Sequence, residues 1–283
     1  MRIILTVAAV LISFSCSLTY AQLDLAMNNS VVYGHHHINA SDIDEHKKFW
    51  VEGLGGDMVS VGESAEQAIS FPNLLVFLTA FRPTGGTRGS MVNHVGFETT
   101  DIFSAVEHLT DMGYPMITKG ELPKSYTVKD GIGRQGQGNI IAYVLGPDDV
   151  KVELIENKGN ANEIQLHHIH WAATEGEEMR AWYTEHFSGV SGTRISQPAV
   201  QLPGINLTFA PSATEMAATK GRVLDHIGFE IDGLEEFCKA LEAKGVVFDR
   251  GYTEVPSLGL AVAFFTDPWG TYIELTEGLD AVN

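Results

Sequence analysis

The pattern of apolar and polar positions repeats one plan four times along the chain: a strand, an amphipathic helix, then further strands. Within residues 226–231, histidine, glycine and glutamate share one face of the expected strand, whereas isoleucine, phenylalanine and isoleucine share the other. The apolar face is expected to pack on a helix, so the opposite face should line a concavity. Helices, each ending at glycine, are expected at 42–56, 101–113, 175–189 and 233–245. Later strands are expected at 73–81, 139–146, 205–212 and 260–267.

The four repeats form two related pairs, in the order ABAB. The first and third helices carry adjacent aromatic residues, whereas the second and fourth share an apolar spacing. Linkers at 82–90 and 211–220 join the repeats within each half, and 158–165 joins the halves. We therefore expect two domains, at 22–157 and 164–283.

Histidine and glutamate recur in register with these repeats. The first strand of every repeat opens on histidine, and two of the last strands close on glutamate. The two histidines of a half are 59 positions apart in the first half and 58 apart in the second. A lone histidine on a strand is usually structural, but six residues in register have the composition of two His-His-Glu metal sites. The candidate ligands are His35, His94, Glu153, His168, His226 and Glu274.

Charge narrows the range of partners. Among 283 residues, acidic side chains outnumber basic ones 36 to 18, which gives a formal net charge of -18. No run rich in lysine or arginine interrupts this negative field. Nucleic acid is therefore not an expected partner, because its phosphates would be repelled. A small molecule is the expected ligand.

The first 21 residues have the pattern of an export signal: Arg2, an apolar stretch, then small and polar residues that end before Gln22. We expect an exported product, periplasmic or secreted. No later segment approaches the ~20 apolar residues of a membrane span, so no integral membrane segment is expected after signal cleavage. Lipid attachment at Cys16 is disfavoured, because Ser13 stands where such signals prefer leucine. Cys238 then remains the only cysteine, and a buried, inert thiol is expected there.

The histidine openings and the closing strands DPWGTYIEL and GPDDVKVEL resemble the vicinal oxygen chelate superfamily. That group includes glyoxalases, extradiol dioxygenases and bleomycin-binding proteins. The resemblance covers residues 31–277 and implies an α+β fold, in which four βαβββ modules form two cupped eight-stranded mixed sheets. In that family each cup surrounds one divalent metal, which chelates vicinal oxygens of a substrate.

The resemblance also implies how the candidate ligands group. It places His35, His94 and Glu153 in one cup, and it places His168, His226 and Glu274 in the other. We expect each half to form its own cup, and an exchange of modules between cups is the alternative.

Two departures from the family pattern bear on the chemistry. Glyoxalases have a further acidic ligand on the last strand of the first module, but segments 74–80 and 205–210 contain no carboxylate. The open three-ligand set is closer to the dioxygenases, and Fe²⁺, Mn²⁺ or Zn²⁺ would suit it. The dioxygenases also use a tyrosine about ten residues before the glutamate. Tyr143 stands there in the first half, but Phe264 replaces it in the second.

Two further histidines complicate the assignment. His37 and His170 lie two positions after His35 and His168, on the same face of their strands. They are either additional ligands or acid/base residues beside the metal, and we favour the second interpretation. The even modules carry Gly96 and Gly228 at the corresponding positions, where they should leave room for a substrate.

The first half contains a Gly-rich insertion of 11 residues relative to the second. Its segment 131–136 spells a dinucleotide-binding fingerprint, but it precedes an expected strand and so offers no helix N-terminus for a pyrophosphate. We expect a flap that carries Lys124, Tyr126 and Arg134 and closes over an anionic substrate. A surface hairpin without a role is the alternative. With Tyr143, this flap makes the first site the expected seat of the chemistry.

Together these features predict an exported, metal-dependent enzyme that chelates a small diol, hydroxyketone or catechol-like substrate. Chemistry of the dioxygenase type or of the lyase/isomerase type would fit. The alternative is a non-catalytic binding or sequestering protein of the bleomycin-resistance type. The expected assembly is a monomer or a homodimer.

Overall fold

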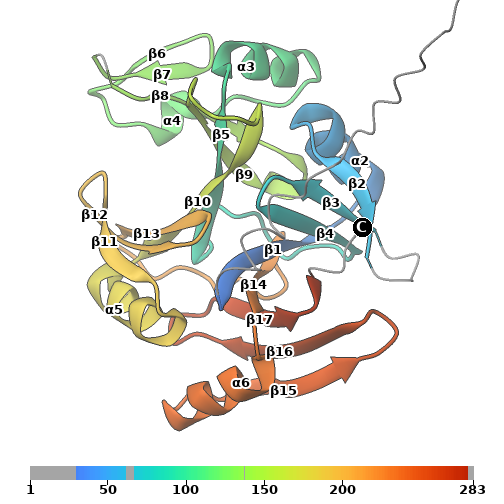
Figure 1. Cartoon of the computed structure of the whole chain (residues 1–283). Coiled ribbons are helices and arrows are strands. Elements are labelled where there is room, and N and C mark those ends of the chain that lie inside the picture. The colour runs from blue at the N-terminus through green and yellow to red at the C-terminus, as the bar shows by residue number, and fades with distance from the viewer. Residues whose placement is uncertain (1–29, 62–66, 137, 280–283) are drawn as a thin grey trace, which may run out of the picture.

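The computed structural model of the chain describes residues 30–61, 67–136 and 138–279. The expected export signal at 1–21, with Cys16, lies outside these described residues. Four modules follow one another, as the hydrophobic pattern predicts (Figure 1). Within the described residues, no helix is long and apolar enough to cross a membrane.

The elements of the four modules are as follows. The first contains β1 (Val31–Ala40), α2 (Ile43–Lys47), the π-helical η1 (Lys48–Gly53), β2 (Asp57–Ser60), β3 (Gln67–Phe71) and β4 (Leu74–Ala80). The second contains β5 (Val92–Thr99), α3 (Ile102–Asp111), α4 (Thr118–Glu121), β6 (Thr127–Lys129), β7 (Ile132–Arg134), β8 (Ile140–Leu145), the short η2 (Pro147–Asp149) and β9 (Lys151–Glu156). The third contains β10 (Ile164–Ala173), α5 (Gly176–Phe187), β11 (Val190–Arg194), β12 (Gln197–Leu202) and β13 (Ile205–Pro211). The fourth contains β14 (Leu224–Ile231), α6 (Leu234–Ala243), β15 (Phe248–Val255), β16 (Leu260–Thr266) and β17 (Tyr272–Glu277).

Local sequence explains where the helices of the first half begin and end. The side chain of Asp42 accepts hydrogen bonds from two backbone N–H groups of α2, and Asp101 does the same for α3. After α3, Gly113 takes a positive φ of 92°, which glycine adopts without a steric penalty.

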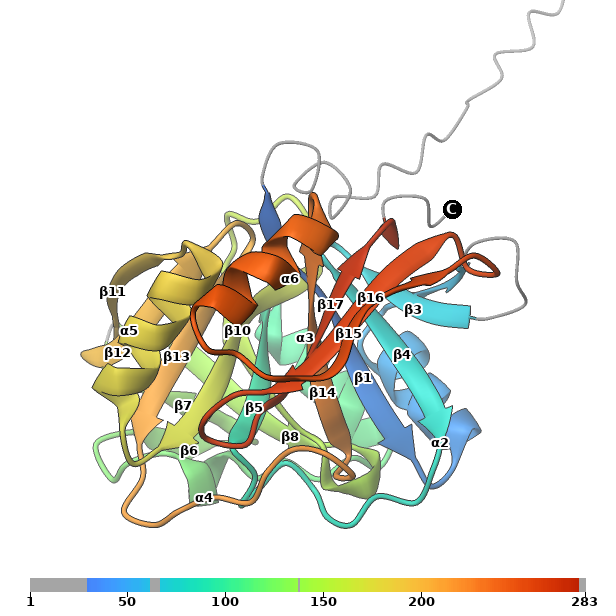
Figure 2. The same cartoon turned by 90° about the horizontal axis from the view of Figure 1, so that it is seen from below.

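The strands assemble into two mixed sheets, and each sheet combines modules from both halves. One sheet has the order β15-β16-β17-β14-β1-β4-β3-β2, and the other has the order β11-β12-β13-β10-β5-β9-β8-β7-β6. Antiparallel pairing of β1 with β14, and of β10 with β5, makes the two junctions. Figure 2 shows β1 lying beside β14, although the two strands come from opposite ends of the chain. The α+β class with two mixed sheets is confirmed, but the expectation that each half forms its own cup is wrong.

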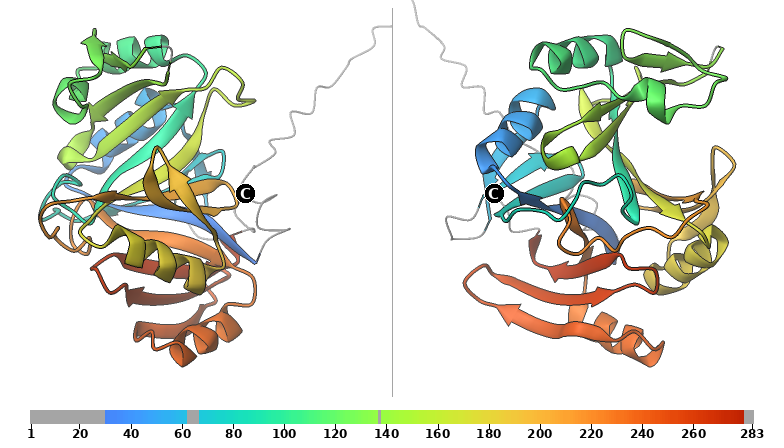
Figure 3. Two further views of the ribbon diagram at one scale, coloured as in Figure 1. Left: turned by 90° about the vertical axis from the view of Figure 1, so that its left-hand side faces the viewer. Right: turned by 180° about the vertical axis from the view of Figure 1, so that it is seen from behind.

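The linkers suggest a physical reason for this exchange. The shortest connection, residues 157–163, joins the second and third modules, and these two modules share a sheet. The connections within each half, 81–91 and 212–223, are longer and cross from one sheet to the other. Both panels of Figure 3 show α3 and α6 at opposite ends of the molecule, so the two modules of even number lie far apart.

A continuous apolar core holds the modules together on the face of the sheets that the helices cover. Its fully buried aromatic side chains come from all four modules and include Trp50, Phe97, Trp171 and Phe229. Cys238 on α6 is buried and makes no disulfide, as expected for an inert thiol. Because the helices occupy one face, the polar alternate positions of the central strands are left to line the two cups.

Candidate metal sites

The two cups bring the six expected ligands together, but in a grouping that differs from the expected one. His168 of the second half joins His94 and Glu153, and we call this set site A. His35 of the first half joins His226 and Glu274, and we call this set site B. The expected grouping by halves is wrong because β10 pairs with β5 and β1 pairs with β14.

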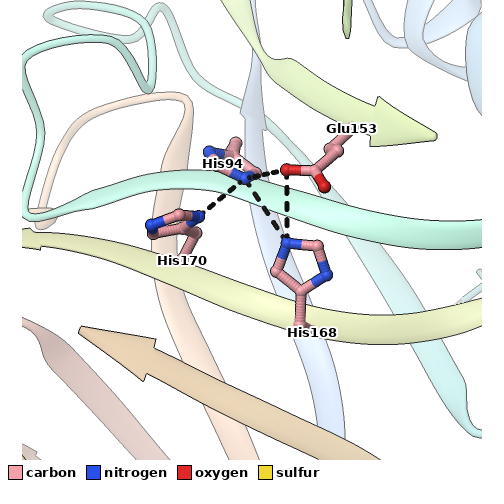
Figure 4. Close-up of side chains that lie close together, drawn as sticks. All are labelled: His94, Glu153, His168 and His170. Atoms are coloured by element: carbon pink, nitrogen blue, oxygen red, sulfur yellow. Dashed lines mark hydrogen bonds and ion pairs between the residues drawn. The ribbon is translucent and has the colours of Figure 1, made fainter. Parts of the chain in front are cut away.

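Site A contains three histidines around one carboxylate (Figure 4). Nε2 of His94 lies 2.7 Å from Oε2 of Glu153, and Nε2 of His168 lies 3.4 Å from the same oxygen. His170 completes the set, because its Nδ1 lies 3.1 Å from Nε2 of His94. One ligand atom from each of the four side chains falls within 4.8 Å of all the others.

Burial fixes the charge states at site A. It lowers the pKa of His94 and of His168 to about 4, so both rings are neutral near pH 7. Burial also lowers the pKa of His170 well below its usual value. Burial alone would raise the pKa of Glu153, but the neighbouring His168 and His94 hold it well below its usual range. A buried carboxylate among neutral imidazoles is the charge pattern that a cation compensates.

Site B has the same core without the additional histidine. Nε2 of His35 lies 2.8 Å from Oε2 of Glu274, and Nε2 of His226 lies 2.9 Å from it. Although burial would raise the pKa of Glu274, the neighbouring His35 and His226 lower it. The ring of His37 lies 4.4 Å, centroid to centroid, from that of His226 with the planes tilted by 31°, but its Nε2 lies 2.6 Å from Oγ1 of Thr79. Burial, and then His226, lower the pKa of His37 to about 3.

Both sites orient one histidine through the preceding residue. Oδ1 of Asn93 lies 3.0 Å from Nδ1 of His94, and Oδ2 of Asp225 lies 2.8 Å from Nδ1 of His226. Such an acceptor fixes the proton on Nδ1 and presents the lone pair of Nε2 to the cup. Burial alone would lower the pKa of His226, but hydrogen bonds to Asp225 and Glu274 raise it above its usual value. The sequence repeat did not single out Asn93 or Asp225, because the two residues differ in type and so do not recur in register.

These contacts test whether a divalent metal fits. At each site, a ring nitrogen lies 2.7–2.9 Å from a carboxylate oxygen. Either a proton or a cation must lie between two such atoms, and a ring that keeps its proton on Nδ1 can offer the lone pair of Nε2 to a cation. Two imidazoles and a carboxylate form the donor set of non-haem iron, and manganese and zinc use the same ligand types. The residues at both sites therefore fit a divalent ion.

Comparison with known proteins places this geometry in a family. A family model for the Glyoxalase/Bleomycin resistance protein/Dioxygenase superfamily matches residues 32–154 and 165–275. The chain belongs to this superfamily. The two matches follow the two halves of the sequence, whereas each of the two cups in this structure takes one module from each half.

Solved structures agree on the fold. Glyoxalase I from Zea mays is similar over 91% of this chain and 96% of its own, with a TM-score of 0.68 and 16% identity. A protein titled as a putative dioxygenase from Bacillus subtilis subsp. subtilis str. 168 is similar over 87% of this chain and 84% of its own, with a TM-score of 0.61 and 12% identity. A comparison with curated proteins finds no match.

In this superfamily member, a pocket of about 90 Å³ adjoins site B. His35, His37 and Glu274 line one side of it. Its remaining wall is mostly apolar and consists of Val61, Phe77, Leu258, Leu260, Val262, Thr276 and Leu279. Because the share of one water in the liquid is about 30 Å³, the pocket has room for a small organic molecule next to the candidate ligands.

At site A, a cluster of apolar side chains lies on the corresponding side of the cup. Strand register makes Ile141 and Ile155 the counterparts of the pocket residues Val262 and Thr276. At site A these isoleucines form an apolar cluster with Tyr143, and Ile117, Leu122 and Tyr126 pack against it. The latter three belong to the region of the insertion, which therefore occupies the side of the cup where site B has its pocket.

This packing corrects the expectation of a flap. Residues 132–134 form β7, which pairs with β8 and with β6 at the edge of the sheet. Arg134 lies over the ring of Phe103 on α3, at 4.9 Å, and so points to the helix side rather than into the cup. Lys124 is exposed, and only Tyr126 packs near site A. The edge hairpin accounts for the ninth strand.

The two glycines have a different role from the expected one. A Cβ atom at Gly96 would lie 1.9 Å from the ring of His168, and one at Gly228 would lie 2.0 Å from the ring of His35. The register explains this, since Gly96 pairs with His168 and Gly228 with His35 across the module junctions. The glycines leave room for a candidate ligand ring, not for a substrate.

Tyr143 lies inside cup A as expected, but its contact is to the carboxylate. Its hydroxyl donates to Oε2 of Glu153 at 2.7 Å. Burial, and then the Glu153 charge, raise the pKa of Tyr143 above its usual value. Phe264 occupies the matching position at site B and packs edge-on against His226.

Arg194 is a site residue that the sequence did not reveal. One of its guanidinium nitrogens lies 3.5 Å from Oε1 of Glu153, and its side chain is 12% exposed. It ends β11 at a hairpin whose turn residues Ile195 and Ser196 both have positive φ. Nothing in the repeat pattern marks this position as part of a metal site. Its guanidinium places a positive charge beside Glu153 at site A.

Proposed function

We propose that the protein is a metal-dependent enzyme of this superfamily whose reaction takes place at site B. The observation that carries this proposal is the convergence of His35, His226 and Glu274 beside a pocket with room for a small molecule. Site A has an equivalent ligand set, but the adjoining space is packed with side chains. A reaction needs both the ligand set and the space, and site B combines them.

The chain's own residues divide the work at site B. His35, His226 and Glu274 would hold a divalent ion such as Fe²⁺, Mn²⁺ or Zn²⁺. When bound, such an ion acts as a Lewis acid that holds two vicinal oxygens and stabilises developing negative charge. Asp225 orients the His226 ring through its Nδ1 proton. His37 lines the pocket beside the ligands, where its ring can take a proton from a bound substrate and return it.

The pocket wall indicates the class of substrate. Apart from Glu274 and the histidines, the described residues that line it carry no charged side chain. A small, uncharged diol, hydroxyketone or catechol-like molecule with an apolar body would bury that body against Phe77 and Val262. An anionic tail would find no cationic partner in this wall. Chemistry of either the dioxygenase or the lyase/isomerase type is compatible with these contacts.

Export and assembly belong to the same proposal. The pattern of residues 1–21 supports a periplasmic or secreted enzyme, and cleavage would leave the two cups intact, since β1 begins only at Val31. In that compartment a small oxygen-bearing molecule is a more accessible substrate than a cytosolic thiol conjugate. Each chain contains two complete cups, so a monomer or a homodimer would suffice.

Elemental analysis and turnover of anaerobically purified protein test the proposal. The wild type should contain up to two ions per chain and convert a member of a panel of small diols, hydroxyketones and catechols. Glu274→Ala should lose one ion per chain and abolish turnover, while Glu254→Ala, which removes an exposed carboxylate of the same sheet, should do neither. Binding of panel compounds without any turnover, at full metal content, would instead identify a sequestering protein of the bleomycin-resistance type.

A further inference from the structure

His37 and His170 occupy equivalent positions on β1 and β10, yet their side chains make different contacts. Each ring lies 4.4 Å, centroid to centroid, from a candidate ligand ring, His226 for His37 and His94 for His170. Nδ1 of His170 points at Nε2 of His94, at 3.1 Å. Nε2 of His37 instead lies 2.6 Å from Oγ1 of Thr79. His170 therefore turns a ring nitrogen toward a candidate ligand, whereas His37 turns one toward a threonine hydroxyl.

The neighbouring parallel strand accounts for the difference. His37 pairs with Phe77 on β4, and His170 pairs with Thr208 on β13. Two residues further on the same face, Thr79 stands on β4 where Ala210 stands on β13. A hydroxyl is thus available to His37 and missing for His170.

The remaining contacts reinforce this contrast. Phe77 stacks on the His37 ring, with the planes 21° apart. Its counterpart Thr208 is too small to do so, and its hydroxyl donates to Oδ1 of Asn206 at 2.7 Å. Both His37 and Phe77 line the pocket of site B. The residues that restrain His37 are therefore part of the pocket wall.

We infer that Thr79 keeps His37 off the ion at site B, whereas His170 is a fourth protein ligand at site A. The inference rests on the proposed function, because it presupposes that a divalent ion binds. Site B then offers three protein ligands and leaves positions open toward the pocket, as catalytic metal sites do. Site A has the four-ligand set that is typical of structural sites. Thr79 is a positioning residue, and the identity of one small side chain separates the two kinds of site.

Reciprocal substitutions test this inference in proteins with one site each. Replacing His226 and Glu274 with alanine leaves only site A intact, and replacing His94 and Glu153 with alanine leaves only site B intact. In the site A protein, Ala210→Thr should capture His170 and weaken Zn²⁺ binding by about tenfold or more, the scale for changing a partner of a ligand. In the site B protein, Thr79→Ala should release His37 and strengthen Zn²⁺ binding by a similar factor. A chromophoric chelator in competition measures both, and the visible absorption of bound Co²⁺ reports the change in coordination.

His170→Ala is the control, because it should weaken the ion at site A at least as much as Ala210→Thr. Adding Ala210→Thr to His170→Ala should then have no further effect. The inference is overturned if His170→Ala leaves Zn²⁺ binding unchanged, or if Thr79→Ala weakens binding or leaves it unchanged at site B. Failure of the site B protein to bind any metal would count against the proposed function instead, whereas failure of the site A protein would overturn the assignment of His170 as a ligand. If a single-site protein does not fold, the same substitutions are made in the full protein, where each should change the affinity of only one of the two metal sites.

Discussion

A Cβ atom at Gly228 would lie 2.0 Å from Cε1 of His35, so the ring of this candidate ligand occupies the space where any other residue would carry its side chain. Gly228→Ala should therefore displace His35 and cost about 1–3 kcal/mol of stability, the usual scale for overpacking. It should also lower the metal content at site B. Chemical unfolding and elemental analysis measure the two effects.

Gly251→Ala provides the control for this prediction. Gly251 lies in the same sheet, on β15, and a Cβ atom there would have open space. The substitution should leave both stability and metal content close to the wild type. Equal behaviour of the two variants would show that the sheet accommodates the methyl group without moving His35.

The pairing of modules across the halves predicts the behaviour of a cleaved chain. A protease site introduced between 157 and 163 would cut the connection between β9 and β10. The two fragments should stay together under native conditions, because β1 pairs with β14 and β10 pairs with β5. Size-exclusion chromatography checks this. Separate elution of two folded fragments, each with its own metal, would contradict the observed sheets.

The ligand positions could be predicted from the sequence because residue types that bind metals recur there at the same position of the repeats. His35 and His168 stand at one position of the module, and Glu153 and Glu274 stand at another. Which of them meet could not be predicted, because exchanging whole modules leaves every internal spacing unchanged. The helix starts at Asp42 and Asp101 were predictable because capping is local.

Other features depend on contacts between segments that carry no shared pattern. Arg194 reaches Glu153 from the far edge of the sheet, and no repeat marks it. The effect of Thr79 on His37 arises from parallel pairing of β1 with β4, so it becomes visible only when the register is known. The Gly-rich insertion was visible as an insertion, but its packing against Tyr143 depends on how α4 folds back.

Tyr143→Phe distinguishes two roles for this tyrosine. Its hydroxyl donates to Glu153, so removing it should loosen the carboxylate and weaken metal binding at site A by about tenfold, the scale for losing a partner of a ligand. Turnover should persist, because the pocket lies at site B. Metal titration and kinetics measure the two. A loss of ~10²-fold in turnover with intact metal content would instead make Tyr143 an acid/base residue and site A the seat of the reaction.

The buried pair of His46 and Asp148 predicts how stability depends on pH. His46 on α2 is fully buried, and its Nε2 lies 3.1 Å from Oδ2 of Asp148 at the turn before β9. Burial lowers the pKa of His46, and the hydrogen bond to Asp148 only partly offsets it. The unfolded chain therefore takes up a proton at this residue near pH 6.5, at which the folded protein has not yet done so. The stability that neutral His46 contributes at higher pH should therefore be lost as the pH falls below about 6.5.

His46→Gln removes this titration and keeps an amide that can donate to Asp148. Between pH 7.5 and 5.5, the free energy of unfolding of the metal-free wild type should therefore fall more steeply than that of the variant. One proton bound only by the unfolded chain changes this free energy by up to about 1.4 kcal/mol per pH unit. Asp148 does not confuse the comparison, because its own pKa is lowered and its contribution is lost only in more acidic solution. Urea unfolding at each pH measures the two slopes. Parallel slopes would mean that His46 takes up its proton as readily in the folded protein as in the unfolded chain.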